Sequence, residues 1–172
     1  MGVLITGDNQ CARGFYQGEC EFGIRNADND CQYDASGCSS CGSEIHACGQ
    51  LISGCVWDIK EQLFIYPNGN EIISNLAVNS ILLHSGSAID EAIPVDFLTL
   101  DDTDDDIGNG TPHYIEIASG FTAHGMEVPQ LDYLNFAFPS GLPYDVLPNM
   151  STTIQFEIAA GIEEPLPDEV SC

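Results

Sequence analysis

The chain has 172 residues, enough for one ordinary domain and the beginning of a second. Hydrophobic residues make up 44% of the chain and aromatic residues 9%, which predicts a packed core and argues against disorder. Twenty-seven acidic residues against three basic ones give a net charge of −24, which excludes nucleic-acid binding, and no apolar run approaches the ~20 residues that membrane insertion requires.

Eight cysteines, most of them in the first third of the chain, indicate disulfide bonds and an oxidising, extracellular compartment. An alternative is a structural zinc site, in which the Cys38-Ser-Ser-Cys41 pair would be joined by His46 and Cys48, although this spacing is tight for zinc. Residues 1–42 predict a long loop region held by the disulfides. The sequence starts without a secretory signal, so we expect it to be a fragment of a longer exported protein.

Apolar residues at three- and four-residue steps predict a helix over 43–64 with one buried stripe. His46 falls off this stripe, on the same face as Gly49, Gln50 and Ser53, where a substrate or partner can approach closely. The predicted stripe consists of Ile45, Cys48, Ile52, Cys55, Val56, Ile59 and Leu63.

Three further helices are expected before the chain changes character. One covers 71–84, and the next begins near Asp90 with Pro94 in its first turn. Thr111-Pro112 opens the last helix, with threonine as the capping residue, and His124-Gly125 ends it. The apolar positions of the first of these helices are Ile72, Ile73, Leu76, Ile81 and Leu82.

The sequence after Met126 predicts β-structure. Apolar and polar residues alternate over 152–158, which is strand periodicity, and 133–136 reads as a short companion strand. Because two strands do not form a stable sheet alone, we expect the chain to enter a β-sandwich-like domain here. The predicted architecture is therefore mainly α, with a disulfide-rich loop region and helical lobe over 1–126 and a linker with the start of a β domain over 127–172.

Four segments, Gly23–Asp28, Glu44–Asp58, Ala92–Leu98 and Gly110–Met126, carry a family resemblance. Their order resembles the C-terminal helical lobe of secreted zinc metallopeptidases of the fungalysin and thermolysin type. The resemblance implies a two-lobed peptidase whose other lobe binds zinc through His-Glu-x-x-His. It also implies that His46 stabilises the oxyanion that develops during peptide hydrolysis. This sequence contains no His-Glu-x-x-His, so the zinc ligands lie outside it and we expect the chain alone to be inactive.

An acidic run over 101–106 is a candidate calcium site. Asp102, Asp104 and Asp106 have the spacing of the first three ligands of an EF-hand loop, and hard oxygen ligands suit Ca²⁺. Ile107 replaces the required glycine and His113 the final glutamate, which excludes an EF-hand and leaves a looser calcium site. The alternative is an acidic loop that precedes a helix start, where negative charge is favourable.

Two functions remain open. The first is the helical lobe of a secreted zinc-dependent endopeptidase that acts on a peptide or protein substrate, with His46 as its catalytic contribution. The second is a non-catalytic, acidic, disulfide-stapled extracellular module that binds a protein partner or has a structural role, stabilised by calcium. The other histidines, His84, His113 and His124, are expected to be structural or exposed.

Overall fold

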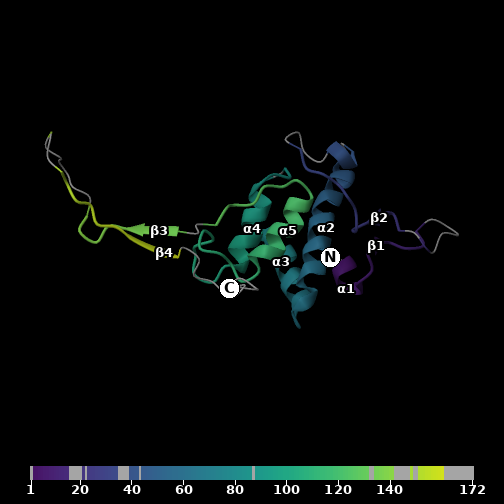
Figure 1. Ribbon diagram of the computed structural model, residues 1–172. Helices are drawn as coiled ribbons and strands as arrows, with labels where there is room; N and C mark the ends of the chain where they lie inside the picture. The colour runs from purple at the N-terminus through teal and green to yellow at the C-terminus, as the bar shows by residue number, and fades with distance from the viewer. Residues whose placement is uncertain are drawn as a thin grey trace.

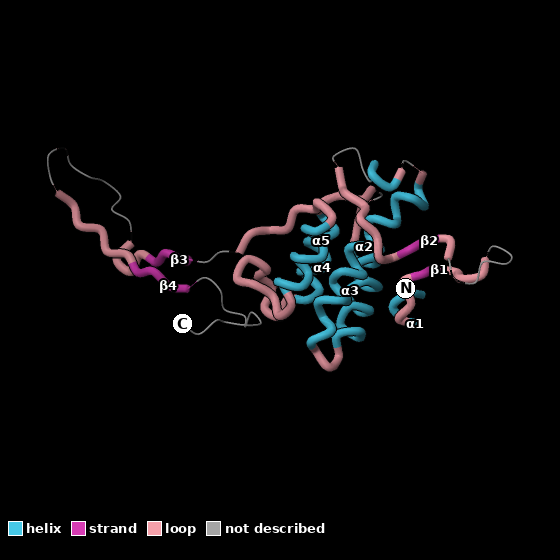
Figure 2. Tube along the Cα trace, turned by 45° about the vertical axis from the view of Figure 1, so that its right-hand side comes forward, coloured by secondary structure: helices cyan, strands magenta, loops and turns pink. Residues whose placement is uncertain are grey.

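The computed structural model describes the chain as a mainly helical body with a β-hairpin that extends away from it (Figures 1 and 2). Helices make up most of the regular structure, which confirms the predicted mainly α class. Whether the helical body has a metallopeptidase-like fold stays a prediction. The described residues are 2–15, 21, 23–34, 39–42, 44–86, 88–131, 134–141, 148 and 151–160.

The longest helix, α2 (Ile45–Gln62), continues into the 3₁₀ turn η2 (Leu63–Ile65), which confirms the helix predicted over 43–64. Glu44 caps its start, because the carboxylate accepts hydrogen bonds from the backbone N–H groups of His46 at 3.0 Å and Ala47 at 3.1 Å. A carboxylate at this place satisfies otherwise unpaired amides and complements the positive end of the helix. These two hydrogen bonds therefore hold the backbone of the first turn of α2 in place.

The buried stripe of α2 was predicted correctly for its middle and end but not for its first residue. Cys55 and Ile59 are fully buried, as is Leu51, which the stripe did not include. Ile45 is 77% exposed, so its predicted burial is wrong. The reason is local, since Ile45 faces a surface groove and not the core.

Helices α3 (Gly69–Leu83) and α4 (Ala92–Asp101) confirm the two helices predicted over 71–84 and from Asp90. Pro94 is the third residue of α4, in the first turn, where a proline loses no hydrogen bond. At the end of α3 the apolar residues Ile81 and Leu82 are 70% and 80% exposed. They lie on the side of the last turn that no described element covers.

Helix α5 (Tyr114–Ala123) begins later than predicted, with His113 and not Thr111 at the capping position. The Thr111 hydroxyl donates a 2.7 Å hydrogen bond to Asp101 Oδ2, so it does not cap the helix. The side chain that the sequence pattern assigned to local capping therefore joins two helices instead.

The core lies between α2, α3, α4 and α5. The rings of Phe97 and Phe121 meet edge to face, with centroids 5.0 Å apart and an interplanar angle of 82°. Helices α2 and α5 approach each other closely at Gly120, where an added Cβ would lie 2.4 Å from Ile59 Cγ1. Only a residue without a side chain permits this contact.

The region before α2 is more ordered than the long loop that the sequence predicted. It contains a short helix, α1 (Gly2–Thr6), and an antiparallel ribbon of β1 (Gln10–Cys11) and β2 (Arg25–Asn26). A 3₁₀ turn, η1 (Ser39–Cys41), precedes α2. The loop character was predicted from the sequence, whereas the ribbon was not, because it pairs residues that are distant in sequence.

A disulfide bond joins Cys31 to Cys41, which confirms the predicted disulfide chemistry. Cys48 is disulfide-bonded as well. Cys41 and Cys48 are therefore not zinc ligands, and the alternative of a zinc site that uses them is wrong. Cys11 is an exposed free thiol and Cys55 a buried one.

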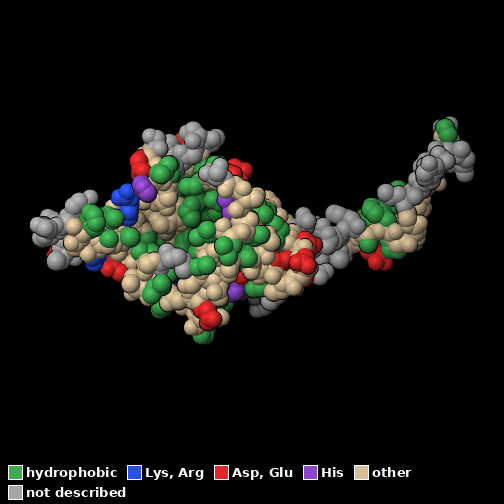
Figure 3. Space-filling view, turned by 180° about the vertical axis from the view of Figure 1, so that it is seen from behind, with side chains coloured by type: hydrophobic (Ala, Val, Ile, Leu, Met, Phe, Trp, Pro, Cys, Tyr) green, Lys and Arg blue, Asp and Glu red, His purple; other side chains and the backbone are tan. Residues whose placement is uncertain are grey.

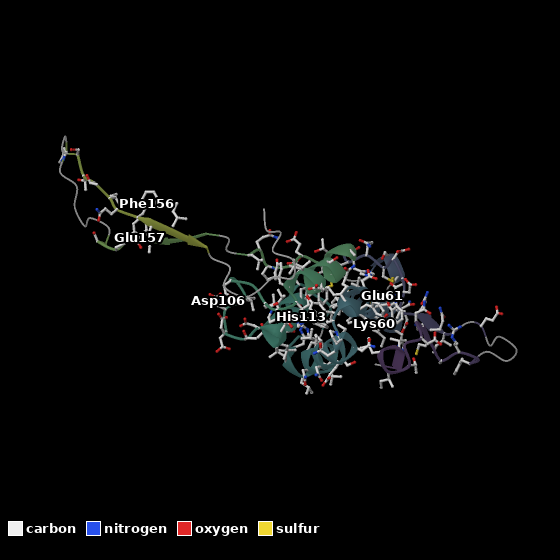
Figure 4. The ribbon with its side chains drawn as sticks, turned by 60° about the horizontal axis from the view of Figure 1, so that its bottom comes forward. Lys60, Glu61, Asp106, His113, Phe156 and Glu157 are labelled. Carbon is white, nitrogen blue, oxygen red and sulfur yellow. A yellow bond between two sulfur atoms is a disulfide. The ribbon has the colours of Figure 1, made fainter. Side chains whose placement is uncertain are left out.

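The C-terminal β-structure is a hairpin of β3 (Leu134–Ala137) and β4 (Glu157–Ala160), in which Phe136 pairs with Ile158. The strand predicted over 152–158 is shorter and begins only at Glu157, because β3 offers just four residues for pairing. Figure 4 labels Phe156 and Glu157 on this hairpin, away from the helical body. A β-sandwich and a domain boundary at residue 126 stay predictions.

Candidate functional site

A groove of about 560 Å³ lies between α1, the β1–β2 ribbon and the first half of α2. Its size lies within the range of small-ligand sites, about 300–1,000 Å³. Its lining combines an apolar wall with a few polar side chains, as ligand sites usually do. The apolar residues include Val3, Ile24, Ala27 and Ile45, and the polar ones are Arg25, His46, Gln50 and Ser53.

His46 lies in this groove, on the face of α2 that the sequence analysis singled out. Its side chain is 75% exposed, and Glu44 Oε1 lies 3.9 Å from its Nε2. Gly49 lies one turn further on, where an added Cβ would meet nothing within 4 Å. The imidazole can therefore turn toward a molecule in the groove without breaking core contacts, and either ring nitrogen can carry the donated proton.

The groove also holds one of the few positive charges of the chain. Arg25 lines it, and its Nη1 donates to the carbonyl oxygen of Ile24 at 2.8 Å. Arg13 is paired with Asp8, and this hydrogen bond lowers the pKa of Asp8 to about 2. On the face seen in Figure 3, basic side chains lie at the end with β1 and β2, and the largest group of acidic ones lies at the opposite end of the helical body.

The predicted calcium ligands lie in the loop between α4 and α5, at the end of the body that faces the hairpin, where Figure 4 labels Asp106. Two of these carboxylates accept hydrogen bonds from the backbone of the same loop. Asp104 Oδ1 accepts from the Asp106 N–H, and Asp106 Oδ1 accepts from the Gly108 N–H, both at 3.0 Å. Within the described ranges, no three His, Cys, Asp or Glu side chains gather closely enough to hold a metal ion.

A second polar cluster, which the sequence did not reveal, joins η2, α4 and α5 around His113 (Figure 4). Asp101 Oδ1 lies 2.6 Å from His113 Nδ1, and this hydrogen bond raises the pKa of the imidazole. The rings of Tyr66 and His113 meet edge to face with centroids 4.9 Å apart. Tyr66 Oη donates to Glu116 Oε1 at 3.1 Å, and Glu116 is only 5% exposed. These contacts fasten α4 and α5 to the end of α2.

The remaining histidines also hold the fold together. His84 Nδ1 lies 2.8 Å from Asp96 Oδ2, which raises the pKa of the ring and ties the end of α3 to α4. His124 is 2% exposed, with Nδ1 2.6 Å from the carbonyl oxygen of Cys31 and Nε2 3.3 Å from Asp58 Oδ2. The expectation that these histidines are structural agrees with this geometry.

Fold and groove together define a mainly helical, disulfide-bonded protein with one histidine in an apolar surface groove. No family model, curated protein or solved structure matches the chain. Among the helices of the described part, none combines the length and apolar character needed to cross a membrane.

Proposed function

We propose that this chain is the substrate-binding helical lobe of a secreted zinc-dependent endopeptidase, in which His46 stabilises the oxyanion of peptide hydrolysis. The observation that supports this proposal is the place of His46, exposed at the start of α2 on the wall of an apolar groove. A protonated ring nitrogen there can donate a hydrogen bond to the oxygen on which negative charge develops. Such a donor accelerates the reaction only in the right position. The cap at Glu44 fixes the backbone of His46, so that rotation of the side chain alone brings the donor to the oxygen.

Zinc does not fit on the described part of this chain. Those residues offer no group of three His, Cys, Asp or Glu side chains, and the sequence contains no His-Glu-x-x-His. The metal and the general base therefore belong to another part of the natural protein or to another chain. The contribution of this lobe is limited to binding the substrate in the groove and to the hydrogen bond from His46.

An extracellular location is part of the proposal. The Cys31–Cys41 disulfide supports it, because such bonds persist in oxidising compartments. The groove also supports a second candidate function, a binding module without catalysis. Ile45, 77% exposed beside His46, could anchor an apolar side chain of a peptide or protein partner.

The test uses the natural gene product, recovered with an antibody raised against the helical body. Zinc content is measured by mass spectrometry, and cleavage of a generic protein substrate is measured with and without a chelator. We expect stoichiometric zinc and chelator-sensitive cleavage, with the His46→Ala variant reduced roughly 10²–10³-fold in kcat. A product without zinc and without cleavage would leave the binding module as the better interpretation.

A matched control separates catalysis from binding. Gln50→Ala alters the same wall of the groove one turn from His46. If His46 acts on the transition state, His46→Ala lowers kcat and leaves KM nearly unchanged, whereas Gln50→Ala acts mainly on KM. If both variants change only the affinity for peptide, His46 has no catalytic role.

A further inference from the structure

Two oxygen atoms of the loop between α4 and α5 are buried without a hydrogen-bond partner. They are Asp102 Oδ1 and Asn109 Oδ1, and within the described part of the chain neither has a donor. Both atoms are acceptors, and a buried acceptor that meets no donor is unfavourable. A cation held by the loop would give such an acceptor a partner.

Hydrogen bonds position the side chain of Asn109 and the backbone of Asp102. Asn109 is only 7% exposed, and its Nδ2 donates to Asp104 Oδ2 at 2.7 Å, which holds the amide against that carboxylate. Asp102 is the C-cap residue of α4, and its backbone N–H donates to the carbonyl oxygen of Leu98 at 2.9 Å. A helix end therefore holds the backbone of Asp102, and a hydrogen bond within the loop holds the side chain of Asn109.

No basic side chain of the chain compensates the charge of this loop. The three Lys and Arg residues are all described: Arg13 pairs with Asp8, Lys60 with Glu61, and Arg25 lines the groove. The imidazole of His113 is hydrogen-bonded to Asp101. No Lys or Arg side chain therefore neutralises the carboxylates of Asp102 and Asp104, although the Asp104 oxygens accept hydrogen bonds from the Asp106 N–H and from Asn109 Nδ2.

We propose that this loop binds one Ca²⁺ ion through Asp102 Oδ1, Asn109 Oδ1 and the carboxylate of Asp104, with water completing the coordination. Ca²⁺ takes six to eight oxygen ligands in flexible geometry and accepts side-chain amide oxygens as well as carboxylates. The ligand set differs from the one predicted from the sequence, because Asn109 replaces Asp106. With only two carboxylates, we expect a Kd of roughly 10⁻⁴–10⁻³ M, as in extracellular calcium modules. The proposal is independent of the peptidase function.

The test is isothermal titration of the full, chelator-treated chain with CaCl₂ at about 0.15 M salt, which screens unspecific attraction to the acidic surface. We expect one site, and a Kd that is weakened roughly tenfold or more in Asp102→Asn and in Asn109→Ala. Asp105→Asn is the matched control. It removes the same charge from an exposed residue of the same loop, and its φ of 71° suits asparagine. Its Kd should equal that of the wild type.

Circular dichroism establishes that each variant is folded, and Asp104→Asn replaces any ligand variant that is not. Titration with MgCl₂ measures binding that depends on charge alone. The proposal is overturned if the wild type binds no Ca²⁺, or if Asp105→Asn weakens binding as much as Asp102→Asn does. Equal affinity for Mg²⁺ and Ca²⁺ would also overturn it, because an irregular loop does not offer the octahedral geometry of Mg²⁺.

Discussion

A hydrogen bond between the side chains of Asp101 and His113 joins the two ends of the loop between α4 and α5, with Oδ1 and Nδ1 2.6 Å apart. The same carboxylate accepts through Oδ2 from the Thr111 hydroxyl and from the backbone N–H of His113, both at 2.7 Å. One buried carboxylate thus holds both ends of an otherwise exposed acidic loop. The stability of the helical body should therefore depend on the protonation of His113.

We expect His113→Ala to destabilise the protein by about 1–3 kcal/mol, because it removes a hydrogen bond to a charged group. The folded state raises the pKa of His113 above its usual value of about 6.5. The charged pair therefore contributes fully below that value, and its contribution is lost as the pH rises through the raised pKa. Urea unfolding at about pH 5.5 and about pH 9 measures this difference.

The control for this prediction is His113→Asn, which can donate to Asp101 without carrying a charge. Its free energy of unfolding should change less between the two pH values than that of the wild type. His84, whose pKa is also raised, is present in both proteins and cancels in the comparison. A wild-type advantage that is equal at both pH values would show that the proton on His113 does not contribute.

The close contact of α2 and α5 predicts opposite effects for two glycine substitutions. Gly120→Ala should cost about 1–3 kcal/mol, because its Cβ would lie 2.4 Å from Ile59 Cγ1 and 2.9 Å from the carbonyl oxygen of Cys55. Gly49→Ala should stabilise α2 by about 0.5–1 kcal/mol, since nothing lies within 4 Å of its Cβ. Thermal unfolding of the two variants measures both. Two substitutions with the same sign would contradict the close approach of the two helices at Gly120.

His46 should be dispensable for stability. Its side chain is 75% exposed, so His46→Ala should change the free energy of unfolding by no more than about 0.5 kcal/mol. Leu51→Ala, one turn further along α2 and fully buried, should cost about 2–5 kcal/mol in the same urea titration. A large loss for His46→Ala would mean that the residue supports the fold, and the functional proposal would lose its main support.

The two free thiols among the described residues should react very differently. Cys11 is exposed, whereas Cys55 is buried and burial raises the pKa of its thiol. An alkylating reagent should therefore label Cys11 in the native protein and Cys55 only after unfolding, as peptide mapping would show. Rapid native labelling of Cys55 would indicate that α2 opens locally.

Helices α2 to α5 were predictable because their apolar residues repeat with helical spacing. Their exposed ends were not, because the burial of Ile45 or Leu82 depends on which neighbour covers that turn. The contacts of Tyr66 with Glu116 and of Asp101 with His113 were also invisible to local patterns. They join elements through tertiary packing, 50 residues apart in the first case. The groove was predictable only on its α2 side, since its other wall comes from the β1–β2 ribbon.

The hairpin of β3 and β4 has a consequence for the behaviour of the protein in concentrated solution. Phe156 and Ile158 are both 57% exposed, on a ribbon that has two strands in the described part of the chain, so that no further described strand pairs with its edges. At low ionic strength the net charge of −24 keeps copies of the chain apart. At about 1 M salt the screening length falls to about 3 Å, and this repulsion no longer protects the ribbon. Under these conditions we expect copies of the chain to associate first through the hairpin, so that salting-out begins there.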